Sequence, residues 1–162
     1  MTLVRTFRAL PLLALFLAGC GGGGSSSRLL EGNTGTVNVA FSNASSFNGS
    51  TAALTSFSTL NGSVNGNSAT VAVTSGSREL DTAIVANNLA QGTTIDLSGA
   101  TATTVVYTDT NGTWAANGGT VTVSQLTSTG MTLTFSNVVL TNASGGSTGS
   151  ATISGTVAFV TG

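Results

Sequence analysis

The chain has 162 residues, of which 6% are charged, with four basic and five acidic side chains. All four basic residues are arginines, and the chain contains neither lysine nor histidine. Catalytic triads, imidazole metal ligands and lysine Schiff bases are therefore excluded. So few positive charges also exclude a nucleic-acid-binding surface. From composition alone we expect no enzymatic activity, no cofactor, no metal and no nucleic-acid partner.

The N-terminus has the pattern of an export signal. Arg5 and Arg8 are its only charges, an apolar run follows from Ala9 to Leu17, and small residues come before Cys20. This run is much shorter than the roughly 20 apolar residues of a membrane-spanning helix. Residues 1–19 are therefore predicted to be a signal peptide that is removed on export.

Leu17-Ala18-Gly19-Cys20 resembles the lipobox of bacterial lipoproteins. The resemblance implies a diacylglycerol thioether on Cys20, cleavage just before it, and a fatty acid such as palmitate on the new amino group. Two or more acyl chains anchor a protein stably, because each buried methylene contributes about 0.8 kcal/mol. Cys20 is the only cysteine, so no disulfide partner explains it. The alternative is an ordinary secretory signal with a cysteine at the cut by chance.

A Gly/Ser tract follows, Gly21 to Ser27, and is expected to be a flexible tether. We assign residues 20–34 to the lipidated cysteine and tether, and residues 35–162 to one folded domain. Gly21 resembles the residue that follows the cysteine in outer-membrane lipoproteins, whereas an Asp there favours retention at the inner membrane. The expected location is the cell envelope, at the outer membrane. Without residues 1–19, two arginines face five carboxylates, a net charge of about −3.

The rest of the chain shows the two-residue alternation of half-buried β-strands. In Thr36–Phe41, the side chains of Val37, Val39 and Phe41 share one face. The alternation recurs at residues 69–73, 120–123, 131–135 and 151–159. This pattern predicts an all-β fold, an antiparallel β-sandwich, with an open β-barrel as the alternative.

After Phe135 the apolar positions change from odd to even numbers, at Val138 and Leu140. A one-residue slip turns every later side chain to the other face, so a bulge is predicted at Ser136–Asn137. Turns are predicted between strands at four Asn-Gly dipeptides: Asn48-Gly49, Asn61-Gly62, Asn111-Gly112 and Asn117-Gly118.

The middle of the chain is less regular. Strands are predicted at Leu80–Ala86, Thr93–Leu97 and Thr101–Thr108, with a turn or short helix at residues 87–92. Residues 44–60 have no firm period.

From about residue 78 onward, the order of features is loosely similar to β-sandwich domains of uncharacterised lipoproteins. The resemblance rests on an aromatic strand with Tyr107, on Trp114, and on the Gly119–Val123 strand. It covers about half of the chain and implies a fold but no activity.

Three constellations are candidates for chemistry. Glu79 and Asp81 would share one face of a strand at a separation of about 7 Å, near that of the two acids of inverting glycosidases. An exposed polar edge beside Arg78 is the favoured alternative. The Asp109–Thr113 segment begins like a calcium loop but lacks its closing Glu, so a β-turn is favoured.

Trp114 and Tyr107 are the third candidate, because they could form a surface on which a sugar stacks. Single aromatics in a small sandwich are more often core residues. The strands also lack the lysines and prolines that guard exposed sheet edges, which makes self-association a further expectation. We expect a lipid-anchored envelope protein with a structural or binding role; a glycan-binding module and a glycan hydrolase are the alternatives.

Overall fold

The computed structural model describes residues 29–99 and 102–161, and within these ranges all regular elements are strands. The predicted signal peptide, Cys20 and the Gly/Ser tract lie outside the described residues. The strands are β1 Leu29–Gly32, β2 Thr34–Ser45, β3 Thr59–Asn65, β4 Ser68–Ser75, β5 Arg78–Val85, β6 Thr94–Asp96, β7 Thr104–Asp109, β8 Gly112–Ala116, β9 Thr120–Leu126, β10 Gly130–Ser144 and β11 Ser150–Val160.

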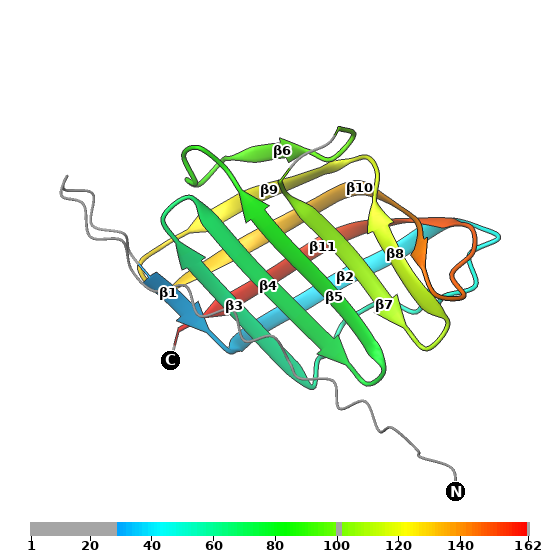
Figure 1. Cartoon of the computed structure of the whole chain (residues 1–162). Coiled ribbons are helices and arrows are strands. Elements are labelled where there is room, and N and C mark those ends of the chain that lie inside the picture. The colour runs from blue at the N-terminus through cyan, green and yellow to red at the C-terminus, as the bar shows by residue number, and fades with distance from the viewer. Residues whose placement is uncertain (1–28, 100–101, 162) are drawn as a thin grey trace, which may run out of the picture.

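The strands form two layers, which face each other across the core (Figure 1). The front layer has the order β1-β3-β4-β5-β7-β8, and the back layer has the order β2-β11-β10-β9-β6. Every strand pairing is antiparallel. Hydrogen bonding is continuous through all 11 strands, but the sheet does not close on itself. The predicted antiparallel β-sandwich is confirmed.

Strand β10 joins the two layers on one side. Its first half, up to Ser136, pairs with β9 in the back layer, and its second half, from Leu140, pairs with β8 in the front layer. Between the halves the register with β11 shifts between Phe135 and Val138, and Asn137 has a φ of 50°. The bulge predicted from the change of apolar phase is therefore confirmed. It lets the side chains on both sides of the bend enter the core.

On the opposite side the chain itself passes from one layer to the other. Strand β1 pairs with β3 in the front layer, and β2, which is separated from β1 by the single residue Asn33, pairs with β11 in the back layer. Strand β1 lies within residues 20–34, the range expected to be tether. The described fold therefore starts before residue 35. The sequence does not predict this strand, because a segment as short as Leu29–Gly32 carries too little alternation to be recognised.

The core is built from the inward side chains of both layers, as the alternation predicts. Val37 and Val39 are at most 5% exposed, and Phe41 is partly buried against them. Met131, Leu133, Phe135, Val138 and Leu140 from β10 are also buried.

The Asn-Gly dipeptides do not all form turns. Asn111 lies in the β7–β8 hairpin turn and Gly112 begins β8, whereas Asn117-Gly118 lies between β8 and β9. Asn61-Gly62 lies inside β3, so the turn predicted there is wrong. A Cβ on Gly62 would overlap the Phe159 ring, so this glycine serves close packing between the layers. The hairpin turn follows four residues later, between Asn65 and Ser68.

The middle of the chain is mostly as predicted. Strands β5, β6 and β7 occupy the three predicted ranges with small changes at their ends. Residues 87–92 form bends and a turn but no helix. Residues 46–58, which have no sequence period, run along the free edge of β2, where Leu54 pairs with Val39 through hydrogen bonds of 2.8 and 2.9 Å. Leu54 is fully buried, so this segment also completes the core.

Candidate functional site

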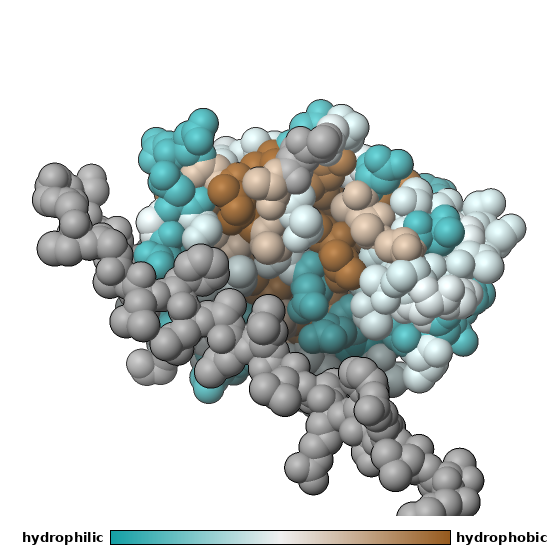
Figure 2. Space-filling model, in the orientation of Figure 1, coloured by the Kyte–Doolittle hydropathy of each residue, from teal (hydrophilic) through white to brown (hydrophobic). Residues whose placement is uncertain are grey.

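A groove of about 650 Å³ lies on the outward face of the front layer. Its wall carries polar side chains from five strands: Glu31, Asn61, Ser63, Thr70, Asp81 and Thr104. Figure 2 shows this outward face, with hydrophobic surface in its middle and hydrophilic residues around it. A concave surface with a few converging polar groups is the usual form of a ligand site.

Strand register explains the shape of the groove. Ala72 on β4 lies between Asn61 on β3 and Asp81 on β5, and the next row places Ala83 beside Thr70. The short alanine side chains leave a hollow between the longer polar ones. The site cannot be recognised in the sequence, because its residues come together only through strand pairing. The outward positions themselves follow from the alternation.

Asp81 is the carboxylate with the most perturbed surroundings in the groove. Partial burial raises its pKa above the ordinary value, and the neighbouring charge of Glu79 raises it further. Among the described residues, no arginine lines the groove to offset these charges. The groove therefore presents negative charge, from Asp81 and Glu31, together with amide and hydroxyl groups.

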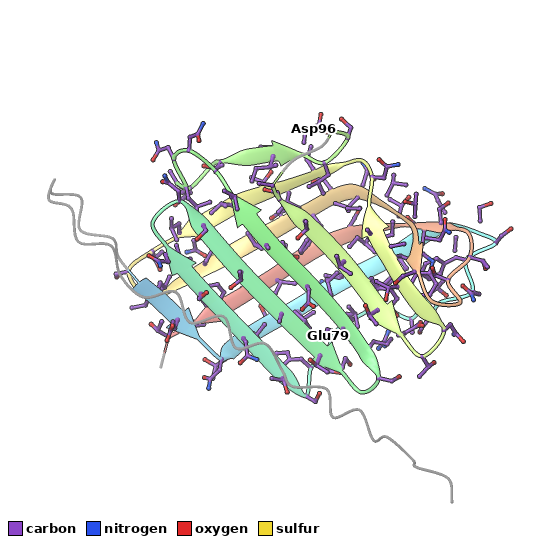
Figure 3. All side chains as sticks on the ribbon, viewed as in Figure 1. Glu79 and Asp96 are labelled. Atoms are coloured by element: carbon purple, nitrogen blue, oxygen red, sulfur yellow. The ribbon has the colours of Figure 1, made fainter. Side chains whose placement is uncertain are left out.

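Glu79 and Asp81 both lie exposed on the outward face of β5, as their spacing predicts. Figure 3 shows Glu79 on this strand, far from Asp96 at β6. Only Asp81 lines the groove. The two acids are side by side on one strand, whereas a glycosidase places its two acids on either side of the bond that it cleaves. This geometry gives the hydrolase hypothesis no support.

Trp114 and Tyr107 face the interior. They pair across β7 and β8, both are 0% exposed, and their ring centroids are 5.8 Å apart. Phe41 and Phe47 complete the cluster, at 5.0 Å from Tyr107 and 4.5 Å from Trp114 respectively. Sugar stacking needs an exposed ring face, and neither residue offers one. The core interpretation of these two aromatics is the one that the structure shows.

The indole nitrogen of Trp114 and the hydroxyl of Tyr107 both donate hydrogen bonds to loop segments that cover this end of the sandwich. Trp114 donates from Nε1 to the Thr148 carbonyl at 3.2 Å, and Tyr107 donates from its hydroxyl to the Ser50 carbonyl at 3.2 Å. Burial raises the pKa of Tyr107 to about 12, with a further contribution from the charge of Asp109.

The segment from Asp109 to Thr113 forms a hairpin turn, which is the structure that the sequence favoured over a calcium loop. The Asp109 carboxylate accepts hydrogen bonds from Ser50 N and Asn111 N, each at 2.7 Å. Its role is to close the turn and to hold residues 46–58 in place. Within residues 29–99 and 102–161, no group of three or more His, Cys, Asp or Glu side chains is placed to hold a metal ion.

No protein-family model, curated protein or solved structure matches this chain. Within its described part, no helix has the length and hydropathy needed to cross a membrane. Cys20, the predicted lipidation site, lies outside the described residues. Within the described residues, the groove around Asp81 is a candidate binding site.

Proposed function

We propose that this chain is a lipid-anchored protein of the bacterial cell envelope, held at the outer membrane by acyl chains on Cys20. The observation that carries the proposal is the sequence Leu17-Ala18-Gly19-Cys20 behind a short charged and apolar leader. Only eight residues separate Cys20 from β1. Even a fully extended segment of that length spans at most roughly 30 Å, so the anchor keeps β1 close to the membrane surface.

The role of the domain is binding rather than catalysis. Its groove is built on paired strands, which hold the polar side chains in fixed positions, and it borders β1 through Glu31 and Gly32. The groove favours a binding role over a purely structural one. The rim of the groove carries carboxylates, amides and hydroxyls, its floor carries Ala72 and Ala83, and its lining has no aromatic platform. The ligand that it fits is therefore small, with polar groups at its edges.

Partitioning of the full chain between detergent and aqueous phases tests the anchor. The protein expressed in a Gram-negative host should enter the detergent phase, and Cys20→Ala should stay in the aqueous phase. Gly21→Asp should keep the lipid but move the protein to the inner-membrane fraction. Equal partitioning of the parent and Cys20→Ala would remove the basis of the proposal.

Thermal-shift measurements with a panel of envelope glycan fragments test the groove. A ligand that stabilises the parent should not stabilise Ala72→Phe, which fills the hollow. Thr134→Phe, on the outward face of the back layer, is the matched control and should respond as the parent does. Turnover of any fragment that is lost in Asp81→Asn or Glu79→Gln would instead support a hydrolase.

A further inference from the structure

The sequence contains five Asn-Gly dipeptides, and the structure places them in different surroundings. At such a dipeptide the backbone nitrogen of glycine can attack the asparagine side-chain amide, because glycine has no side chain to hinder the approach. The attack requires a free amide group and a backbone that can rotate. Hydrogen bonds to the asparagine side chain, or a glycine held within a strand ladder, oppose it.

Three of the five sites are held in place. The side chain of Asn48 donates to the Gly146 carbonyl at 2.9 Å and accepts from Thr148 N at 2.7 Å. Asn111 donates from Nδ2 to the Asn48 carbonyl at 2.9 Å.

The third held site is Asn61-Gly62, which lies inside the ladder. Gly62 pairs with Gly32 of β1 on one side and with Val71 of β4 on the other. Rotation of the chain at Asn61 would therefore disrupt pairing on both sides.

At the other two sites, Asn65 and Asn117, neither the side-chain amide nor the glycine is protected, although Asn65 itself is the last residue of β3 and pairs with Leu29 and Ser68. Both side chains are exposed, and neither amide group has a hydrogen-bond partner among residues 29–99 and 102–161. Gly66 lies in the β3–β4 turn with a φ of 58°, and Gly118 lies between β8 and β9, so both glycines are outside the strands.

At Asn117-Gly118, the backbone hydrogen bonds are made by atoms other than the attacking glycine nitrogen. Asn117 N donates to the Val139 carbonyl at 2.8 Å, and the Gly118 carbonyl accepts from Val139 N at 3.1 Å. The amide nitrogen of Gly118 is not part of either bond, so these bonds restrict rotation of the chain but leave the attacking atom free.

We propose that Asn65 and Asn117 are sites of spontaneous deamidation in the folded protein, with water as the only co-reactant. The glycine nitrogen loses its proton and forms a bond to the asparagine Cγ, the bond from Cγ to Nδ2 breaks, and the departing NH2 group takes up a proton and leaves as ammonia. Water then opens the five-membered imide at either carbonyl and gives aspartate or isoaspartate. No oxidant or reductant is needed.

The modification changes the charge of a chain that has little charge. Each conversion adds one negative charge, so two conversions take the formal net charge from −1 to −3. Asn65 lies on the same outward face of β3 as Asn61 and Ser63, so its conversion places a new carboxylate beside the groove. The inference stands independently of the lipid anchor and of any ligand.

Peptide mapping by mass spectrometry after incubation of the full chain in mildly alkaline buffer tests the proposal. Peptides with Asn65 and Asn117 should gain the mass of an amide-to-acid conversion, and the peptide with Asn48, which must lose two hydrogen bonds, should convert at least about tenfold more slowly. In denaturant all five sites should convert at similar rates.

Gly118→Ala provides a control within the same molecule. A Cβ at this position would come no closer than 3.7 Å to Val139, so the fold tolerates it, and the added methyl group hinders attack. Conversion at Asn117 should fall while conversion at Asn65 continues unchanged. Equal rates for all five sites in the native protein, or faster conversion at Asn48, Asn61 or Asn111, would overturn the proposal.

Discussion

Asp109 is predicted to hold one end of the sandwich together. Its carboxylate accepts hydrogen bonds from Ser50 N and Asn111 N at 2.7 Å each, and the Tyr107 hydroxyl lies at 3.5 Å from Oδ2. A hydrogen bond to a charged group contributes about 1.5–3 kcal/mol, and partial exposure favours the lower end of this range. Asp109→Ala should therefore lower the free energy of unfolding by about 3 kcal/mol, since it removes both short bonds. Asp109→Asn keeps one acceptor oxygen and should cost about half as much.

Urea unfolding followed by the fluorescence of Trp114, the only tryptophan, measures this loss. Glu79→Gln, which changes an exposed carboxylate on β5, is the matched control and should unfold close to the parent. Asp109→Asn should also lower the pKa of Tyr107, because the charge of Asp109 helps to raise it. If Asp109→Ala unfolds at the same urea concentration as the parent, residues 46–58 are not held in the way described.

Three further outcomes follow from the same structure. Leu54→Ala should lower the free energy of unfolding, measured in urea, by about 2–5 kcal/mol. It should also loosen the segment that covers the β2 edge and so increase self-association, measured by sedimentation. Tyr107, the only tyrosine, should ionise near pH 12 in the folded state by ultraviolet titration, against about 10 when unfolded, so stability should fall as pH rises from 10 to 12. Because the folded-state pKa of Asp81 is raised, Asp81→Asn should stabilise the protein at neutral pH by less than about 0.5 kcal/mol, and this gain should vanish at acidic pH, where the parent carboxyl is protonated.

The fold could be predicted from sequence because most strands bury only one face. Alternation marked β2, β10 and β11, and the change of phase after Phe135 located the bulge that joins the layers. Such signals are local, and they reflect burial directly. Turn residues were less informative, because glycine has two uses. Gly112 directly follows a hairpin turn as the first residue of β8, whereas Gly62 lies inside β3 and makes room for Phe159, a residue 97 positions away.

The candidate site could not be predicted, because the groove depends on which strands become neighbours. Asn61, Thr70 and Asp81 come from three strands, and no spacing in the sequence relates them. Tyr107 and Trp114 attracted interest as rare amphipathic aromatics, yet they are buried because residues 46–58 fold over this end of the sandwich. That segment has no period, so its covering role depends on tertiary contacts alone.

The intact mass of the protein extracted from membranes tests the lipid anchor most directly. The expected product is a chain that begins at Cys20 and carries the mass of a diacylglycerol group and an additional fatty acid. Cys20→Ala should lack this lipid mass and should not be retained in the membrane fraction. A parent protein that carries no acyl mass, or one that retains residues 1–19, would contradict the proposed envelope function.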